Sequence, residues 1–407
     1  MPLSTPVCVT AYTATSALGC GMKAHVSAFK AQRSGLQRLM SGAMLPSRHG
    51  IGVTARLDTW VGQVEGLDAP LPGKWSHWDC RNNRLAWLGL QGEGFYEAVH
   101  AAGQRYGPHR VAVILGSSTS SIGATEEAYR QLASQGVFPN QACNPHLHTL
   151  HSLALFVQEA LGITGPCTTV STACSSSAKT FASGARLLAL DLVDAVVVGG
   201  VDTLCGSVLY GFNGLQLVSP EPCRPFDRQR RGINLGEAAA FALLERGAAG
   251  LRLMGAGESS DAYHLSAPQP SGQGVLNALD EALQSAGVDA AQVDYLHAHG
   301  TATPKNDAIE AQVIAQRFPL RTRVSSTKGF TGHALGAAGA LGAAFCLQAL
   351  ETGTLPGTMG TQDPEADIAP YLLLAPAEQP VDIAVCHAFG FGGSNCVLVF
   401  GHQQDNP

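Results

Sequence analysis

One cysteine in this chain stands where its side chain could do chemistry. Cys174 lies in the small-residue stretch Val170–Lys179, and from Ala178 onward apolar residues recur at three- and four-residue steps. This pattern predicts a strand before Cys174 and a buried helix after it. The unpaired amides and positive dipole at a helix start favour a thiolate. On this stretch alone, Cys174 could equally be a small buried core cysteine.

Two histidines complete a set with a chemical purpose. His299 follows the predicted strand Val293–Ala298, and His333 stands at a loop-to-helix transition in an apolar segment. Either histidine alone would more often be a satisfied core residue, and the nearby His297 is predicted to be structural. Together with the thiol, two imidazole N–H donors could polarise an acyl carbonyl and stabilise an enolate while the cysteine carries another acyl group.

A glycine-rich segment, His387–Asn395, is the third candidate element. Its glycines allow positive φ and close backbone approach, so its amides could form part of an oxyanion hole. The alternative is a tight turn between two strands. Gly390 lies between two phenylalanines, which suggests a bulky ring that must move.

The composition bounds the class of protein. The chain has 407 residues, 45% of them hydrophobic and 14% charged, with 47 glycines, which excludes disorder and coiled coil. A net charge of −6 without a polybasic block argues against nucleic-acid or membrane-surface binding. We find no run of about eighteen apolar residues that would span a membrane and no signal peptide. Eleven cysteines without a CxxC pair indicate reduced thiols and a cytoplasmic location.

A third histidine group is a weaker candidate. His146, His148 and His151 lie within six residues but have no Cys or carboxylate at ligand spacing, so we expect no metal. A metal-binding hydrolase remains the alternative that this group would support.

The elements around the candidates predict a repeated α/β architecture. The apolar runs 110–116 and 195–200 are typical of strands buried on both faces of a parallel sheet, and 83–105 is predicted to be one helix. A weak repeat relates 170–197 to 324–385: each has a strand, a small-residue helix, a strand and a Gly-rich turn. We therefore predict two related halves, 1–248 and 249–407, whose strand ends meet at a shared cleft.

Four blocks make the chain resemble a known family: Ser171–Ser175, His297–Pro304 with Asn306, Asp307 and Glu310, Lys328–Gly339, and Phe389–Asn395. Arg224–Asp227 with Gly236 and Glu237 matches a further block. The chain resembles the β-ketoacyl-acyl carrier protein synthases of the thiolase superfamily, in the Cys-His-His type I/II branch. The resemblance implies the thiolase fold, in which two pseudo-repeated α/β halves form five αβαβα layers.

The same resemblance implies a decarboxylative Claisen condensation. Cys174 would take an acyl group from the phosphopantetheine arm of an acyl carrier protein. Malonyl-carrier protein would follow, with His299 and His333 holding its thioester carbonyl while carbon dioxide leaves. The amides of Cys174 and Phe389 would form the oxyanion hole, and Phe389 with Gly390 the gate. No metal or bound cofactor is implied.

Supporting roles also follow from the resemblance. Lys328 would be an electrostatic partner paired with Glu310, and Asp307 would support the site. Thr301 and Thr303 would hydrogen-bond the pantetheine arm. An acidic carrier protein needs a basic docking patch, for which the sequence offers Arg81, Arg84, Arg130 and Arg228, with Arg230 and Arg231 close by.

Departures from the family pattern and the choice of partner leave alternatives. Ser117–Ser121 is polar where fatty-acid elongation enzymes would have apolar residues bounding the acyl pocket, which suggests a non-standard chain such as a polyene or polyketide. A homodimer is the family expectation. The alternatives are the ketosynthase subunit of a heterodimer with a chain-length factor, or a non-catalytic thiolase-fold partner, which the intact Cys174 and both histidines disfavour.

Overall fold

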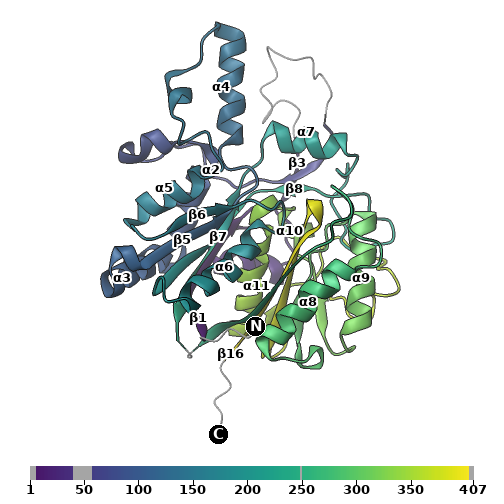
Figure 1. The fold of residues 1–407 in the computed structure, drawn as a ribbon. Helices are drawn as coiled ribbons and strands as arrows, with labels where there is room; N and C mark the ends of the chain where they lie inside the picture. Colours follow the sequence, from purple (N-terminus) through teal and green to yellow (C-terminus); the bar gives the residue numbers. More distant parts are fainter. Residues whose placement is uncertain (1–5, 40–56, 248–249, 403–407) are drawn as a thin grey trace.

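Two five-stranded sheets with the same strand order form the centre of the fold (Figure 1). The computed structural model describes residues 6–39, 57–247 and 250–402. The first sheet has the order β6-β5-β7-β9-β1 and the second β12-β11-β15-β16-β10. The strands of the first are β1 (Val7–Ser16), β5 (Val111–Gly116), β6 (Cys167–Val170), β7 (Ala195–Asp202) and β9 (Ala238–Arg246). Those of the second are β10 (Leu251–Ser260), β11 (Tyr295–His297), β12 (Arg323–Ser325), β15 (Ile383–Gly390) and β16 (Ser394–His402).

Strand directions repeat as well as strand order. In each sheet three neighbouring strands are parallel and the last two are antiparallel. β1 pairs with β10 through Val7–Leu253 and Cys8–Arg252, which joins the two sheets. The short β2 (Gly19–Cys20) pairs with β1 as the eleventh strand. This topology confirms the internal repeat, while the boundary predicted between residues 248 and 249 lies outside the described residues.

Helices complete the five layers. Between the sheets lie α6 (Ser176–Ala189) and α11 (Ala338–Thr352), which share one hydrophobic core with the inner faces of both sheets. The outer face of the first sheet is covered by α2 (Arg81–Leu90), α3 (Phe95–Tyr106) and α5 (Ser152–Leu161). α8 (Gln273–Ala286) and α9 (Pro304–Arg317) cover the second (Figure 1). The thiolase fold is therefore confirmed.

Smaller elements surround this core. They are α1 (Met22–Lys30), α4 (Ile122–Gln135), α7 (Gly206–Gly214), α10 (Lys328–Thr331), the three-stranded sheet of β3 (Leu36–Arg38), β4 (Trp60–Gly62) and β8 (Leu235–Gly236), and the pair β13 (Thr354–Leu355) and β14 (Ala377–Glu378). α4 projects from the body of the molecule (Figure 1).

The prediction of a single helix over 83–105 was wrong. Glu93 and Gly94 adopt positive φ, and this divides the segment into α2 and α3.

One helical stretch differs from the expected absence of long apolar runs. Leu335–Thr352 is long and apolar enough to cross a bilayer by length and composition, but 83% of it is buried inside the protein. Its apolar character is explained by its place between the two sheets, as the core helix of a layered fold.

Small residues allow α6 and α11 to lie in close contact. A Cβ atom at Gly339 of α11 would lie 2.7 Å from the Cβ of Ala178 in α6. The Ala340 amide donates to Ser177 Oγ at 2.8 Å, and a Cβ at Gly116 would lie 2.4 Å from the Ser177 amide nitrogen. The starts of both central helices are thus fixed against each other and against β5.

Gly339→Ala should therefore destabilise the protein, by about 1–3 kcal/mol, because the added methyl overpacks the helix contact. Gly103→Ala is the matched control, since this glycine also lies in a helix and a Cβ there meets no atom within 4 Å. The control should be more stable than the wild type by about 0.5–1 kcal/mol. Denaturant unfolding measures both changes, and a Gly339→Ala protein as stable as the control would contradict the close contact.

Candidate active site

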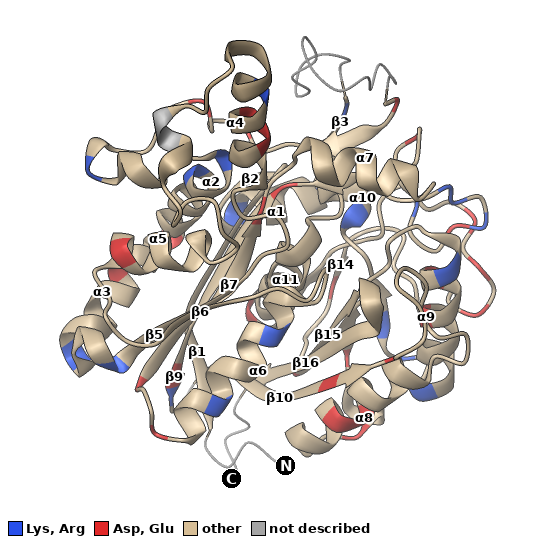
Figure 2. Ribbon diagram, turned by 45° about the horizontal axis from the view of Figure 1, so that its top comes forward, with Lys and Arg blue, Asp and Glu red and all other residues tan. Residues whose placement is uncertain are grey.

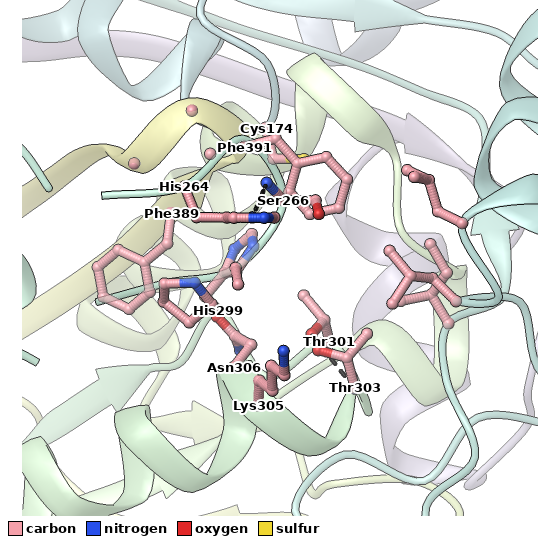
Figure 3. Close-up of a pocket in the computed structure, with 18 of the residues that line it drawn as sticks. Cys174, His264, Ser266, His299, Thr301, Thr303, Lys305, Asn306, Phe389 and Phe391 are labelled. Carbon is pink, nitrogen blue, oxygen red and sulfur yellow. Dashed lines mark hydrogen bonds between the residues drawn. The ribbon is translucent and has the colours of Figure 1, made fainter. Parts of the chain in front are cut away.

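A pocket of about 370 Å³ brings together side chains from both halves of the chain (Figure 3). Cys174 comes from the first half, and His299, His333 and Phe389 come from the second. The structure therefore unites the cysteine and both histidines that the sequence singled out.

Cys174 lies in the turn between β6 and α6, two residues before the helix begins. The preceding residue, Ala173, has a φ of 52°, an uncommon conformation for a residue with a side chain. The thiol is buried, with 5% of the residue exposed. Burial raises the pKa of Cys174 to about 12, and the charge of Lys328 opposes this only in part. The resting thiol is therefore protonated near neutral pH, contrary to the expected thiolate, and its proton must leave as the sulfur attacks.

His299 is held by its backbone at the end of β11. The Glu310 carboxylate, from α9, accepts the amides of His299 and Gly300, each at 2.7 Å. The Lys328 ammonium donates to the carbonyl oxygen of His299. Burial, followed by the positive charge of Lys328, lowers the pKa of His299 well below its usual 6.5, so the ring is neutral.

His333 has a defined tautomer. The Leu335 amide donates to His333 Nδ1 at 3.1 Å, and because Nδ1 accepts, the neutral ring carries its proton on Nε2. Burial and the Lys328 charge lower the pKa of His333 well below 6.5. The rings of His299 and His333 lie 5.4 Å apart and nearly perpendicular. Two neutral imidazoles thus lie together beside one thiol.

The predicted ion pair between Lys328 and Glu310 is absent from the described residues. Glu310 instead pairs with His387, whose Nδ1 lies 3.0 Å from Oε1. The negative charge of Glu310 still acts on Lys328, although burial is the larger influence and lowers the pKa of Lys328. Sequence reasoning missed His387, whose only signal is its position at the start of the glycine-rich segment.

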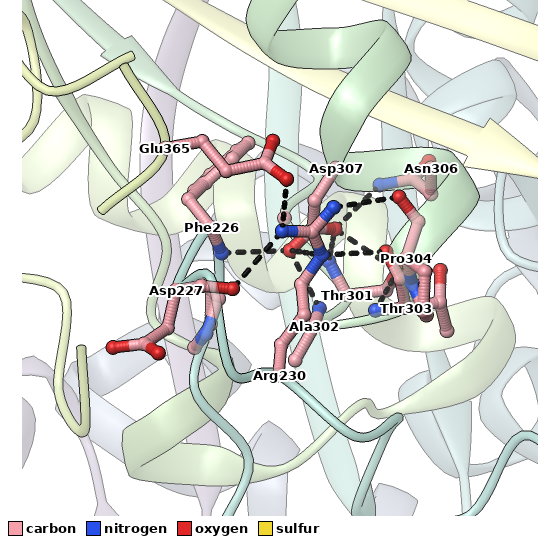
Figure 4. Close-up of polar contacts among 12 residues, drawn as sticks. Phe226, Asp227, Arg230, Thr301, Ala302, Thr303, Pro304, Asn306, Asp307 and Glu365 are labelled. Carbon is pink, nitrogen blue, oxygen red and sulfur yellow. Dashed lines mark hydrogen bonds and ion pairs between the residues drawn. The ribbon is translucent and has the colours of Figure 1, made fainter. Parts of the chain in front are cut away.

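Asp307 organises the two threonines expected to bind the arm (Figure 4). Its carboxylate accepts the amides of Thr301 at 2.9 Å, Ala302 at 3.0 Å and Phe226 at 2.7 Å. The hydroxyls of Thr301 and Thr303 lie 2.9 Å apart and both residues line the pocket. Burial raises the pKa of Asp307 to about 6. Asp307 thus supports the site by holding the backbone of the turn that carries Thr301.

The glycine-rich segment places a different phenylalanine at the sulfur than the one predicted. The backbone amide of Phe391 lies near enough to the Cys174 sulfur to lower the pKa of the thiol. The Phe391 ring stacks on Phe212, with centroids 5.4 Å apart. Phe389 is buried in β15, where its ring packs against His299 at 5.6 Å. The amide and gate assigned to Phe389 therefore fit Phe391, the first residue after the strand.

Gly390 leaves no room for a side chain. A Cβ atom there would lie 2.6 Å from the carbonyl oxygen of Thr172, in the turn that carries Cys174. The glycine between the two phenylalanines thus brings the end of β15 against the thiol's own turn.

The comparisons with known proteins agree over most of the chain. The model of the β-ketoacyl synthase N-terminal domain matches residues 5–249, and that of the C-terminal domain matches residues 252–362. The chain belongs to the β-ketoacyl synthase family. It is an acyltransferase of the decarboxylating, condensing type.

Individual relatives support this membership. Nodulation protein E of Rhizobium meliloti (strain 1021) is 34% identical over 307 residues, covering 72% of this chain and 75% of the relative. The 3-oxoacyl-(acyl-carrier-protein) synthase 2 of Vibrio cholerae is 32% identical over 314 residues, with the same coverage of 72% and 75%. A solved ketosynthase in complex with its chain length factor, from Xenorhabdus doucetiae, is 34% identical, with a TM-score of 0.87 and 99% of each chain covered.

The arginines predicted to dock a carrier protein have other partners in this synthase. Arg81 donates through Nε and Nη2 to the buried carboxylate of Glu237, each at 2.7 Å, and through Nη2 to the carbonyl of Val64 at 3.1 Å. Arg84 binds both oxygens of Asp79. Each guanidinium therefore holds local structure, and docking by Arg81 and Arg84 stays a prediction. Lysines and arginines lie on several elements (Figure 2).

The remaining docking candidates differ among themselves. Arg130 pairs with Glu127 on its own helix. Arg230 is buried, bonding Glu365 and the backbone of the Thr303 turn (Figure 4). Arg228 is exposed, 3.6 Å from Asp363, and with the exposed Arg231 stays a candidate.

The polar turn after β5 does not make the pocket polar. The hydroxyls of Ser117, Ser118 and Thr119 donate to Asp202. Those of Ser120 and Ser121 donate to the carbonyls of Thr149 and Leu147. Since the hydrogen-bonding capacity of these hydroxyls is used within the protein, they give no reason to expect a polar acyl chain.

Among the described residues, no group of three or more His, Cys, Asp or Glu could hold a metal ion.

The pKa shifts predict a split pH dependence. Between about pH 8 and pH 6 the kcat of the acylated synthase should stay constant, because both histidines remain neutral when their pKa values lie well below 6.5. The KM for carrier-bound substrate should rise toward pH 6 as Asp307, with its pKa of about 6, takes a proton and loses its hold on the Thr301 turn.

Single-turnover condensation of pre-acylated protein, measured against the concentration of malonyl-carrier protein across this pH range, gives both parameters without the acylation step. Asp307→Asn is the control: its KM should be raised at all pH values and nearly independent of pH. A kcat that falls with a midpoint near 6.5 would show that the histidines titrate normally and would contradict the neutral-imidazole site.

Proposed function

We propose that this protein condenses malonyl-acyl carrier protein with an acyl group held as a thioester on Cys174, extending a fatty-acid or polyketide-type chain. The observation that carries the proposal is the convergence of one thiol and two neutral imidazoles in one pocket. Decarboxylation drives the condensation, so the site needs hydrogen-bond donors and no strong base.

In the first step Cys174 takes the acyl group. Its sulfur attacks the thioester carbonyl of the acyl-pantetheine arm, the carbon–sulfur bond to the arm breaks, and the departing thiolate takes up the proton that Cys174 loses. The amides of Cys174 and Phe391 stabilise the oxyanion. The contact of the Phe391 amide with the sulfur supports this assignment.

In the second step malonyl-carrier protein binds. His299 and His333 donate hydrogen bonds to its thioester carbonyl, and His333 does so through Nε2–H. Carbon dioxide leaves, and the electrons of the broken carbon–carbon bond form an enolate. The enolate carbon attacks the acyl-cysteine carbonyl, the bond to the Cys174 sulfur breaks, and the departing thiolate takes a proton from solvent. Lys328 stabilises the anionic states through its buried charge, which adds to burial in keeping the histidines neutral.

The substrates bring their own prosthetic group, so the protein needs no bound cofactor. Thr301 and Thr303 hydrogen-bond the phosphopantetheine arm, and their place across the pocket from Cys174 supports this (Figure 3). Lys305 follows them at the pocket lining, is exposed, and makes no ion pair within the described residues. Its ammonium contacts the anionic phosphate of the arm.

For assembly we keep two candidates. The solved ketosynthase that is 34% identical over nearly the whole chain is in complex with a chain length factor, which favours a heterodimer with a related subunit. A homodimer is the second candidate. In either case β6 lies at the edge of the sheet, where its backbone can pair with another subunit. The intact cysteine and histidines make this chain the catalytic member, which we place in the cytoplasm.

Replacement of the three residues should separate the two steps. Intact-protein mass measured after incubation with an acyl donor should show one acyl adduct on the wild type and none on Cys174→Ala. His299→Ala and His333→Ala should keep the adduct but lose condensation by about 100-fold or more. An undiminished adduct on Cys174→Ala would refute the nucleophile, and full condensation by either histidine variant would refute the carbonyl-binding role.

Lys305→Glu tests the contact with the arm. The KM for carrier-bound malonyl should rise about 10-fold, since a charge contact is replaced by repulsion, whereas the KM for a short thioester without the phosphate should not change. Lys23→Glu, at another exposed lysine on α1, should alter neither value. Equal effects of Lys305→Glu on both substrates would place the lysine outside the phosphate contact.

A further inference from the structure

Asp202, the last residue of β7, carries a fully buried carboxylate close to the active site. Six donor groups bind it. They are the hydroxyls of Ser117 (2.6 Å), Ser118 (2.7 Å) and Thr119 (2.6 Å) and the amides of Ser118 (3.0 Å), Thr119 (2.9 Å) and Gly336 (2.6 Å). Within the described parts of the chain no cation pairs with it. Its charge is therefore balanced by hydrogen bonds alone.

One of the six donors comes from the other half of the protein. Gly336 lies three residues after His333, while the other donors belong to the turn that follows β5. A Cβ at Gly336 would lie 2.7 Å from the Asp202 carboxylate and 2.8 Å from the Ser118 amide nitrogen. The close approach of the carboxylate to this backbone thus requires glycine at position 336.

The backbone between Gly336 and His333 transmits this contact to the imidazole. Leu335 has a φ of 53°, a conformation that a leucine keeps only when its surroundings enforce it. Its amide is the donor to His333 Nδ1. The peptide of His333 itself is fixed elsewhere, by the carbonyl of Asn234 at 2.7 Å and the amide of Gly236 at 2.9 Å. The backbone position of His333 and the orientation of its ring therefore have separate anchors.

We propose that Asp202 is a positioning residue that fixes the ring orientation and tautomer of His333 through Gly336 and Leu335. A carboxylate of the first half would thus set the geometry of a histidine from the second half. This inference rests on the proposed function, in which His333 Nε2–H binds the malonyl carbonyl. An asparagine cannot replace Asp202, because its amide offers one acceptor oxygen and turns an NH₂ group toward donors.

Asp202→Asn should lower the kcat of condensation by about 10- to 100-fold, as expected when a reacting group is misplaced by a fraction of an ångström to 1 Å. The KM for malonyl-carrier protein should stay within about threefold. Loading of the acyl group onto Cys174, followed by intact-protein mass, should not be slowed, since Asp202 raises the pKa of that thiol and its removal favours ionisation. A general loss of structure would slow loading and condensation together.

Glu126→Gln is the matched control, because Glu126 also accepts two backbone amides, of Gly206 and Ser207, but at the start of α7. It should leave both rates unchanged. If Asp202→Asn does not fold, Ser118→Ala tests the same link and should lower only the kcat, by about 3- to 10-fold. Full condensation in Asp202→Asn, or equal slowing of loading and condensation in the variant that folds, overturns the inference. Condensation that persists in His333→Ala would instead overturn the proposed function.

Discussion

The contact between α6 and α11 is the constraint on which the site depends. α6 begins two residues after Cys174 and α11 begins five residues after His333, so the place where the two helix starts meet is also the place where thiol and imidazole meet. Ala178, Gly339 and the bond from Ala340 to Ser177 keep the helices close. A larger residue in this contact would move the two helices apart and would separate the Cys174 thiol from the His333 imidazole.

Burial then sets the electrostatic character of the pocket. Because these side chains are buried, the thiol stays protonated and both histidines stay neutral, and the buried ammonium of Lys328 acts on all three. A neutral imidazole with a fixed proton suits a reaction in which negative charge develops on a carbonyl oxygen. The carboxylates of Glu310, Asp307 and Asp202 accept backbone amides around this centre. These carboxylates hold the loops around the pocket in place. The pocket itself is lined by hydrogen-bond donors such as the imidazole groups of His299 and His333.

The sequence predicted the elements that local pattern specifies. Cys174 between a strand and a small-residue helix, the two histidines, and the repeated halves all follow from periodicity and from short motifs. Contacts between residues far apart in the sequence could not be predicted. Arg81 was interpreted as a surface arginine because its partner, Glu237, lies far along the chain. Ser117–Thr119 was interpreted as a polar pocket wall because its partner, Asp202, is also distant in sequence. Phe389 and Phe391 flank the same glycine, and only the end of β15 at Gly390 decides which amide reaches the sulfur.

A single turnover of pre-acylated protein with malonyl-acyl carrier protein labelled in the carboxyl group tests the central claim most directly. We predict that one labelled carbon dioxide is released for each acyl group that leaves Cys174, at the same rate, and that the carrier protein gains a β-ketoacyl chain two carbons longer than the acyl donor. Release of carbon dioxide without chain extension, or loss of the acyl group from Cys174 without release of carbon dioxide, would contradict this account.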